Sequence, residues 1–466
     1  MPKVHMVGIG GAGMSAIAQI LLAQGVEVTG SDVTASATTD RLSGWGARVA
    51  IGHAAENLGD AEMVVVSRAI QDGNPEVAAA QRQGVPVLQR GEMLARLMDK
   101  QKGVVVAGTH GKTTTTSMIA LVLERGGLDP AALVGGTVPH LGGNARAGQG
   151  EYLVAEADES DGSFLLLQPH IAVVTNIEAD HLDHWGSLDR IIEGFRQFLS
   201  QVTPGGAAIV CQDDDLLRSM AEAGREADQA SGRNRRWLTY GLTGQPDILG
   251  KHPELSGFGS RTEVYRHGEY LGLLELVVPG RHNIADALAA VTAGLEVGLT
   301  FHVIASALRE FTGVQRRFQR IGTARGVTVV DDYAHHPSEI RATLQAARQV
   351  AAGKVIVCFQ PHRYTRTQFL LEEFGQAFAD ADGIFITDIY AASEPPIPGV
   401  TGRAVVEAIG RHTGQAAEFV PRLQDVPARV AAVAAPGDLV LTLGAGNIWT
   451  AGAHILERLT ASEERV

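Results

Sequence analysis

The chain has 466 residues, of which 45% are hydrophobic and 20% are charged, a globular composition in a chain too long for one ordinary core. No apolar run approaches the roughly 20 residues that a membrane helix requires, and the formal net charge of −13 opposes binding to a nucleic-acid backbone. We therefore expect a soluble protein of about three domains that binds neither a membrane nor nucleic acid.

The amino-terminal stretch enters a strand-like segment at once and lacks the regions of a signal peptide, which predicts a cytoplasmic protein. The two cysteines, Cys211 and Cys358, support neither a disulfide framework nor a thiolate zinc site, so we interpret them as core residues. We interpret the basic run of Arg233, Arg235 and Arg236 as a solvated loop.

Residues 1–100 alternate short β-branched runs with helical patterns, which is typical of βαβ units in a parallel sheet. A helix is expected over residues 13–24. The expected strands are Val4–Gly8, Glu27–Gly30, Ala47–Ile51, Met63–Ser67 and Val85–Gln89. This pattern predicts a small, doubly wound, Rossmann-like domain.

A glycine-rich loop follows the first of these strands. It contains Gly8, Gly10, Gly11, Ala12 and Gly13. Asp32 follows the second strand, at about the position of a ribose-binding acid. Such a loop binds a pyrophosphate at a helix amino terminus and is indifferent to nicotinamide, so a dinucleotide and a UDP-sugar are both acceptable ligands. Taken alone the loop indicates a dehydrogenase, and a purely structural glycine turn is the other alternative.

A second domain is expected over residues 101–312, beginning with the apolar strand Gly103–Ala107. Helices are expected over residues 112–125 and 285–297. The further expected strands are Tyr152–Glu156, Ile171–Asn176 and Ala207–Cys211. The stretch 222–262 is the least regular, and a smaller antiparallel sheet is our interpretation of it.

The segment after Ala107 follows a strand and opens a helix, which is the context that a phosphate-binding loop requires. Its residues are Gly108, Thr109, His110, Gly111, Lys112, Thr113 and Thr114. In such a loop backbone N–H groups approach the phosphates, Lys112 neutralises them and Thr113 ligates Mg²⁺. The standard spacing would put a glycine at Val106, so this loop is a shortened variant; a chance Gly-Lys-Thr helix cap is the alternative.

Glu156 ends one predicted strand of this domain, and His181 lies just after another. Because ligands bind at the carboxyl ends of parallel strands, both side chains are expected to face one crevice with Lys112 and Thr113 and to hold two metal ions. A helix-capping acid and a hydrogen-bonded structural histidine are the alternatives for Glu156 and His181.

Residues 313–466 return to alternating strands and helices, which predicts a third, Rossmann-like domain. The expected strands are Thr328–Asp332, Lys354–Gln360, Gly383–Asp388 and Asp438–Leu443, and the expected helices are Ser338–Val350 and Thr367–Ala379. The whole chain is thus predicted to be an α/β protein of three domains, each built on a mainly parallel sheet with flanking helices.

Five segments of the sequence resemble those of the Mur ligase family, and the resemblance extends from end to end of the chain. They are the glycine loop 8–13, the phosphate loop 108–114, Glu156–Asp161, Asp331–Pro337 and Gln360–Arg366. The resemblance implies domains for UDP-sugar (1–100), ATP (101–312) and amino acid (313–466).

The resemblance also implies a reaction in peptidoglycan precursor synthesis, and thus a role in cell-wall biogenesis, cell shape and cell division. The lactyl carboxylate of UDP-N-acetylmuramate attacks the γ-phosphate of ATP, giving an acyl phosphate and ADP, and the amine of L-alanine then displaces phosphate. Two Mg²⁺ ions, for which Mn²⁺ can substitute, and Lys112 would offset the charge that slows one anion's attack on another.

Further site residues are carried over from the resemblance. Asn283 with His282 is expected at the adenine, and Arg317 at the ATP phosphates. The substrate side of the third domain is expected to be lined by Tyr333, His335, Arg363 and Arg366, the last three in catalytic roles. An arginine there can pair with a carboxylate or an acyl phosphate, whereas surface cations and packing side chains are the alternatives.

This sequence departs from the family pattern at two points. Gln315 stands where a glycine usually precedes Arg-Arg-Phe. There is also no lysine between Lys112 and Lys251, so a carbamylated lysine, which several Mur ligases place on the second metal, is impossible in this stretch. We therefore expect His181, water and ATP oxygens to hold the second ion.

Three other functions compete with the alanine ligase. One is a ligase that recycles a murein tripeptide onto the same UDP-sugar. The second is an NAD-dependent oxidoreductase, which would leave the phosphate loop idle, and the third is a nucleotide-sensing module. A monomer or weak homodimer is expected, with closure of the third domain to shield the acyl phosphate.

Overall fold

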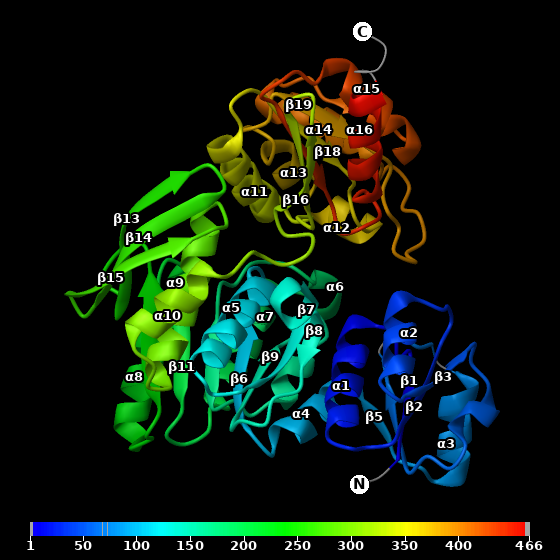
Figure 1. The fold of residues 1–466 in the computed structure, drawn as a ribbon, viewed down its shortest axis with the longest axis vertical. Helices are drawn as coiled ribbons and strands as arrows, with labels where there is room; N and C mark the ends of the chain where they lie inside the picture. Colours follow the sequence, from blue (N-terminus) through cyan, green and yellow to red (C-terminus); the bar gives the residue numbers. More distant parts are fainter. Residues whose placement is uncertain (1–2, 68, 72, 462–466) are drawn as a thin grey trace. The chain divides into compact units, whose positions relative to one another are not determined.

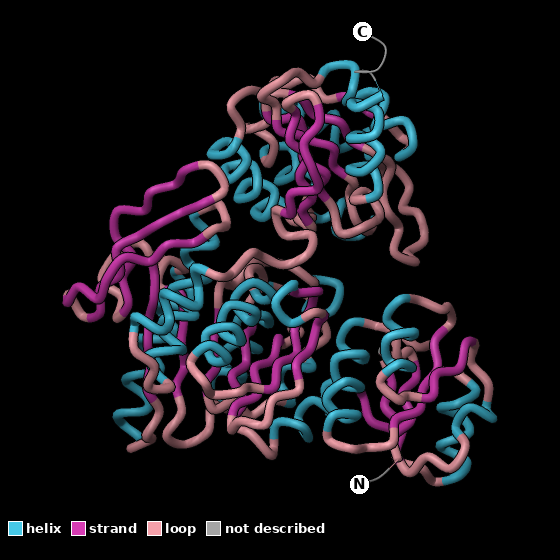
Figure 2. The backbone as a smooth tube through the Cα atoms, viewed as in Figure 1, coloured by secondary structure: helices cyan, strands magenta, loops and turns pink. Residues whose placement is uncertain are grey.

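The computed structural model describes residues 3–67, 69–71 and 73–461 (Figures 1 and 2). The chain divides into two compact units, which are described separately below. The first comprises residues 1–251, 263–274 and 285–311, and the second 252–262, 275–284 and 312–466. Within the described ranges, no helix has the length and apolar character needed to cross a membrane.

The first unit begins with a five-stranded parallel sheet of order β3-β2-β1-β4-β5. Its strands are β1 (Val4–Val7), β2 (Val28–Asp32), β3 (Arg48–Ile51), β4 (Met63–Val66) and β5 (Val87–Gln89). The helical segments are α1 (Ala12–Ala23), α2 (Ala37–Gly44), η1 (Ala55–Leu58), α3 (Pro75–Gln83) and α4 (Arg90–Met98). Strand β1 is central and fully buried, which explains its apolar run. The predicted Rossmann-like sheet is confirmed.

A second sheet has ten strands in the order β15-β14-β13-β12-β11-β10-β6-β9-β7-β8. Its strands are β6 (Lys102–Ala107), β7 (Ala131–Val138), β8 (Gly143–Arg146), β9 (Tyr152–Glu156), β10 (Ile171–Val174), β11 (Ala207–Cys211), β12 (Arg236–Gly241), β13 (Ile248–Ser256), β14 (Gly259–Arg266) and β15 (Glu269–Leu276). The helical segments of this part are α5 (Lys112–Arg125), η2 (Pro139–Leu141), η3 (Ser163–Leu166), α6 (Leu182–Trp185), α7 (Leu188–Ser200), α8 (Asp215–Ser231), α9 (Arg281–Glu296) and α10 (Phe301–Arg309). Strand β6 pairs in parallel with β9 and β10, so the segments after these three strands meet at one sheet edge.

The expectation of a smaller sheet in the stretch 222–262 is wrong: its first residues continue helix α8, and its strands belong to the ten-stranded sheet, in which β12 pairs in parallel with β11 and β13. Asp214 caps this helix by accepting a hydrogen bond from the N–H of Leu217, and Gly232 ends it in the left-handed conformation. Its buried apolar side chains, Leu217, Met220 and Ala221, precede residue 222, so the part of the helix inside the stretch has no apolar face to mark it.

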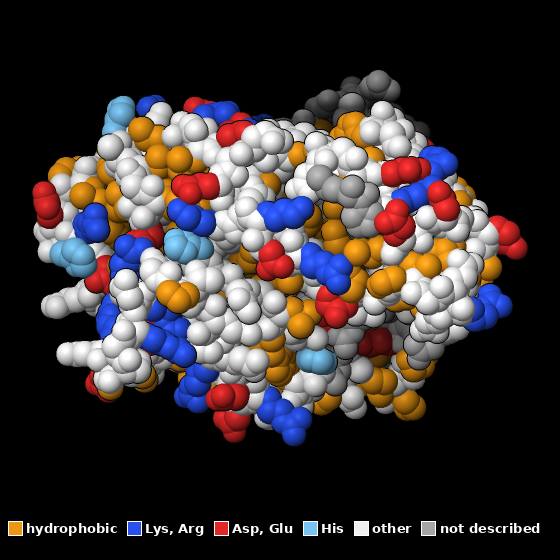
Figure 3. Space-filling view, turned by 90° about the horizontal axis from the view of Figure 1, so that it is seen from below, with side chains coloured by type: hydrophobic (Ala, Val, Ile, Leu, Met, Phe, Trp, Pro, Cys, Tyr) orange, Lys and Arg blue, Asp and Glu red, His pale blue; other side chains and the backbone are white. Residues whose placement is uncertain are grey.

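The basic run at the start of β12 also differs from its interpretation as a solvated loop. The side chain of Arg235 is only 7% exposed, and its guanidinium forms a forked pair with Asp228 at 2.7 and 2.9 Å. Trp237 donates to the same carboxylate at 2.7 Å. Arg233 and Arg236 are exposed, and on the face drawn in Figure 3 basic and acidic side chains are interspersed.

The second unit contains a six-stranded sheet of order β16-β17-β21-β18-β19-β20. Its strands are β16 (Gln319–Ala324), β17 (Val327–Asp332), β18 (Val355–Phe359), β19 (Gly383–Ile386), β20 (Glu418–Phe419) and β21 (Leu439–Leu443). Its helical segments are α11 (Pro337–Val350), α12 (Tyr364–Phe369), α13 (Leu371–Gln376), α14 (Gly402–Thr413), η4 (Leu423–Asp425), α15 (Val426–Val433) and α16 (Thr450–Ala461). All its strand pairs are parallel except β16–β17.

Alternate residues of β18 enter two hydrophobic cores on opposite faces of this sheet. Val355, Val357 and Phe359 contribute to one core, and Ile356 and Cys358 to the other. Because both faces of the strand are buried, its sequence is a continuous apolar run. The predicted third, mainly parallel sheet is confirmed. The expected helix 367–379 is instead two short helices that meet at Leu370.

Candidate active site

The phosphate loop connects β6 to α5 through two glycines with positive φ, Gly108 and Gly111. Gly108 has φ +133°, and a Cβ there would lie 2.1 Å from the hydroxyl oxygen of Thr175. Gly111 has φ +79°, and its Cβ would lie 2.6 Å from a carboxylate oxygen of Asp286. Because other residues rarely adopt this backbone and have no space here, glycine is required at both positions.

The loop is held by the segment that follows β10. The backbone N–H of Thr109 donates to the carbonyl of Asn176 at 3.0 Å, and the N–H of His110 to the side-chain carbonyl of Asn176 at 2.8 Å. Thr175 donates its hydroxyl hydrogen to the carbonyl of His110 at 2.5 Å. Sequence reasoning missed Thr175 and Asn176, although polar residues at the end of an apolar strand were the available signal.

Lys112 lies at the first position of α5, and its ammonium makes three hydrogen bonds. The acceptors are the carbonyls of Gly108 at 2.6 Å and Thr109 at 3.0 Å, and a carboxylate oxygen of Glu159 at 2.8 Å. Burial opposes the charged form, but attraction to Glu159, and then to Glu156 and Asp158, exceeds that effect and raises the pKa of Lys112 above its ordinary value. Lys112 is therefore a partly buried cation at the start of the helix.

Glu156 lies beside Thr113, as the sequence predicts. The Thr113 hydroxyl donates to Oε1 of Glu156 at 3.1 Å, and the backbone N–H of Gly135 donates to Oε2 at 2.7 Å. The second contact comes from β7, a strand absent from our sequence prediction. Glu156 is thus fixed with one oxygen directed to the phosphate loop.

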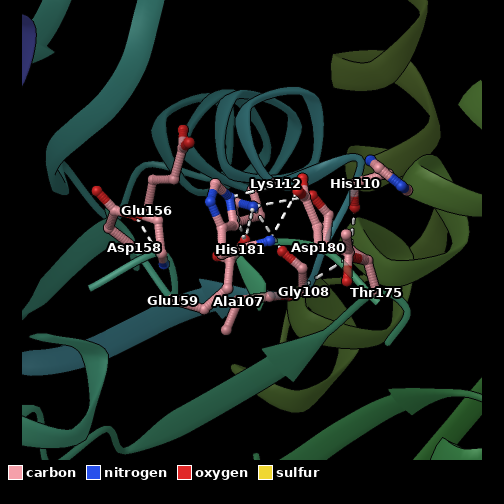
Figure 4. A network of polar contacts seen from close by, with 12 residues as sticks. Ala107, Gly108, His110, Lys112, Glu156, Asp158, Glu159, Thr175, Asp180 and His181 are labelled. Carbon is pink, nitrogen blue, oxygen red and sulfur yellow. Dashed lines mark hydrogen bonds and ion pairs between the residues drawn. The ribbon is translucent and has the colours of Figure 1, made fainter. Parts of the chain in front are cut away.

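His181 is near the same loop, in contact with acids. Its Nε2 atom lies 3.6 Å from Oδ2 of Asp180 and 3.9 Å from Oε1 of Glu159. Figure 4 shows Lys112, Glu159 and His181 near one another at the amino-terminal end of α5. Burial raises the pKa of Glu159 to about 7, with Lys112 acting in the opposite direction. Sequence reasoning did not single out Glu159 or Asp180.

The glycine loop that was predicted to bind UDP-sugar follows β1 of the first sheet. The N–H of Gly10 donates to Oδ2 of Asp32 at 2.8 Å, so the predicted ribose acid contacts the loop itself. A Cβ at Gly13 would lie 2.7 Å from a guanidinium nitrogen of Arg90, which also pairs with Asp158 at 2.9 Å. Arg90 is a cation at this loop that the sequence reasoning missed.

The second unit contains the expected adenine residues. Asn283 is buried and donates to the carbonyl of Pro279 at 2.6 Å, and its side-chain nitrogen lies 3.2 Å from Nε2 of His282. Burial, followed by the charge of Arg317, lowers the pKa of His282 to about 4. His282 is therefore neutral at physiological pH.

The structure brings two residues of the predicted third-domain face, Tyr333 and His335, together with Arg317, which was predicted at the ATP phosphates. The rings of Tyr333 and His335 are 5.4 Å apart, and the guanidinium of Arg317 lies 5.3 Å from the centre of the Tyr333 ring. The ring of His362 is 6.0 Å from His335 and stacks on Tyr390 at 5.6 Å. His362 and Tyr390 were not among the predicted residues.

The two predicted arginines have different environments. The side chain of Arg363 is 41% exposed and lies 3.9 Å from Glu394. Arg366 is 9% exposed, and its guanidinium lies 3.4 Å from Nδ1 of His362. Arg366 therefore joins the group containing His335, whereas Arg363 borders solvent.

These features define a class of protein: an α/β enzyme whose P-loop sheet falls, in chain order, between two Rossmann-like sheets. Three family models match the chain, described as the Mur ligase family catalytic domain (residues 3–102), the Mur ligase middle domain (106–294) and the Mur ligase glutamate ligase domain (316–446). The chain belongs to the Mur ligase family.

Individual relatives match over nearly the whole length. The UDP-N-acetylmuramate–L-alanine ligase of Pelotomaculum thermopropionicum is 50% identical, over 99% of this chain and 98% of the relative. The enzyme of the same name from Desulforamulus reducens is 51% identical over 98% of each chain. The crystal structure of the UDP-N-acetylmuramate-alanine ligase MurC of Thermotoga maritima matches with a TM-score of 0.82 at 30% identity, covering 99% of this chain and 100% of that one.

Proposed function

We propose that this protein is an ATP-dependent ligase that joins L-alanine to the lactyl carboxylate of UDP-N-acetylmuramate in peptidoglycan precursor synthesis. The observation that carries the proposal is the phosphate loop in which Thr113 contacts Glu156 and Lys112 contacts Glu159, in a chain half identical to ligases of that name. ATP is the activating substrate, and an acyl phosphate is the intermediate.

The first Mg²⁺ site of the proposal consists of Thr113 and Glu156. Their oxygens are 3.1 Å apart, and ligands at 2.0–2.1 Å on adjacent corners of an octahedron are about 3 Å apart. A hydroxyl and a carboxylate are also ligands that Mg²⁺ prefers. These two residues therefore fit the ion, and His181 is proposed at a second one. Bound Mg²⁺ would neutralise phosphate charge.

The phosphate loop itself has two tasks in this mechanism. Its backbone N–H groups and the amino terminus of α5 bind the phosphates, while Lys112 supplies a full positive charge beside them. This charge lowers the repulsion between the incoming carboxylate and the γ-phosphate and stabilises the transferring group. The remaining residues of the loop, Thr109, His110, Gly111 and Thr114, belong to the same proposed ATP site.

We assign the other substrates by domain. Residues 1–100 bind UDP-sugar through the glycine loop and Asp32, and residues 101–312 bind ATP. Residues 313–466 bind the amino acid. In the second unit, His282, Asn283 and Arg317 are assigned to ATP, and Tyr333, His335, Arg363 and Arg366 to the substrates. The proposal includes a cytoplasmic monomer or weak homodimer.

The test is phosphate release from ATP with UDP-N-acetylmuramate and a single added amine. Rapid release with L-alanine, together with the UDP-N-acetylmuramoyl-L-alanine product by mass spectrometry, is expected. Release that requires a murein tripeptide instead would assign the recycling reaction. NADH binding without any amine-dependent phosphate release would overturn the proposal. Glycine and serine, tested in parallel, measure amine selectivity, which size discrimination alone limits to about 1–3 kcal/mol per methylene.

A further inference from the structure

Glu159 is a buried acid that the proposed function has not used. It follows Glu156 by three residues, is 4% exposed, and has one oxygen bonded to Lys112. The other oxygen, Oε2, is buried without a hydrogen-bond partner among the described residues. Buried polar atoms are nearly always paired, so a bare carboxylate oxygen beside a nucleotide site indicates a partner that arrives with the ligand.

The bonds of Lys112 indicate which contact changes when nucleotide binds. An ammonium has three hydrogens, and all three are donated, to two loop carbonyls and to Glu159. Lys112 therefore donates to a phosphate only after it releases one acceptor. The carbonyls of Gly108 and Thr109 belong to the loop, so the side chain of Glu159 is the acceptor that can leave. A carboxylate that stayed in place would also repel the triphosphate.

A second destination for this carboxylate lies within reach. The Nε2 atom of His181 is 3.9 Å from Oε1 of Glu159, which is too long for a hydrogen bond. Two adjacent ligands of an octahedral cation at about 2.1 Å are about 3 Å apart, so a side-chain shift of about 1 Å would let these two atoms share one ion. The Glu159 carbonyl accepts hydrogen bonds from the Trp185 indole at 2.9 Å and from the N–H of Gly162 at 3.2 Å, which fixes the backbone. Only the side chain has to move.

We propose that Glu159 exchanges partners during nucleotide binding: it is the counter-ion of Lys112 in the free protein and a ligand of the second divalent cation, with His181, in the complex. The exchange frees one Lys112 hydrogen for the phosphates and places a cation between the carboxylate and the triphosphate. This inference rests on the proposed function for the nucleotide and its metal ions, and it adds Glu159 to the residues assigned there.

The experiment counts Mn²⁺ ions by electron paramagnetic resonance in the full-length protein with a non-hydrolysable ATP analogue. Wild-type protein is expected to bind two ions per chain, and Glu159→Gln to weaken the second by at least about tenfold. Glu151→Gln removes an exposed acid just before β9, the strand that precedes the segment containing Glu159. This variant controls for lost charge and is expected to retain both ions. Without divalent ions, Glu159→Gln is expected to bind the analogue more tightly than wild type, because the competitor for Lys112 is gone.

Unchanged affinity for both Mn²⁺ ions in folded Glu159→Gln protein would overturn the inference, and so would unchanged metal-free affinity for the analogue. If that variant does not fold, Glu159→Asp keeps the charge but withdraws the carboxylate, and it must weaken the second ion. Failure of the proposed function is distinct, because wild-type protein would then release no phosphate with L-alanine. An active wild type with an unaffected Glu159 variant refutes this inference alone.

Discussion

Glu76 is a fully buried acid in the first sheet domain, and its environment illustrates how single side chains set stability. Its oxygens accept hydrogen bonds from Ser31 at 2.5 Å, Asn57 at 2.6 Å and the N–H of Ala54 at 3.2 Å, and lie 3.4 Å from Nε2 of His5. Burial alone would raise its pKa, but the hydrogen bonds outweigh it and lower the pKa of Glu76 from 4.5 to about 2. The ionised form is thus the one that the fold stabilises.

Glu76→Gln is expected to lower the free energy of unfolding by about 3 kcal/mol at neutral pH. Because the folded pKa is depressed, the wild-type advantage is complete above pH 4.5 and declines as the pH falls through about 2. Urea denaturation of both proteins at neutral and at acidic pH measures this. If the two proteins differed in free energy of unfolding by the same amount at neutral and at acidic pH, the charge of Glu76 would contribute nothing to stability.

Residues whose role is local were predictable from the sequence. Lys112 and Thr113 follow from strand–loop–helix context, and Glu156 from its place at a strand end. Asn176 and Glu159 were not predictable in this way. The role of Asn176 depends on the pairing of β10 with β6, and the role of Glu159 depends on its burial. Neither property is encoded in the spacing of residues.

At the scale of elements, the conformation of the phosphate loop requires that the carboxyl ends of β6 and β10 lie close together. Gly108→Ala would place a Cβ 2.1 Å from the Thr175 hydroxyl in a backbone region with φ +133°. We expect it to cost about 1–3 kcal/mol of stability and to weaken ATP binding by at least about tenfold. Calorimetric ATP titration and thermal unfolding measure the two effects.

Gly127→Ala is the matched control at the other end of α5. Gly127 also has positive φ, +77°, but a Cβ there has nothing within 4 Å. This variant should lose some stability through backbone strain and keep its ATP affinity. Equal ATP affinities in both variants would contradict a role for the Gly108 turn in shaping the phosphate site.

Elements with strong periodicity were predictable, and those defined by tertiary pairing were not. The buried strand β6 and helix α5 appear where the sequence predicts them. Strands β7 and β8 were missed because their glycines and polar residues give a weak strand pattern. The α12–α13 junction was missed because its residues contain no glycine or proline to mark the break.

At the scale of the whole molecule, the glycine loop after β1 and the phosphate loop after β6 are each held by their own sheet. The Gly10 loop is fixed by Asp32 at the end of β2, and the phosphate loop by Asn176 after β10. Within the first unit, contacts between the two sheet domains include Asn144 to the carbonyl of Ala12 at 2.5 Å. The loops thus have separate supports, which predicts two sites that can be disabled separately.

Lys112→Ala is therefore expected to weaken ATP binding by at least about tenfold. The affinity for UDP-N-acetylmuramate is expected to stay unchanged, because the removed charge lies at the phosphate loop of the second sheet and not at the glycine loop of the first. Asp32→Ala is expected to do the reverse, because it frees the Gly10 loop that would bind the diphosphate. Both variants should lose phosphate release with L-alanine, since the reaction requires both substrates. Separate calorimetric titrations of each variant with ATP and with UDP-N-acetylmuramate measure the two affinities. If either substitution weakened both ligands equally, the two loops would form one coupled site, and the assignment of one nucleotide to each sheet would be wrong.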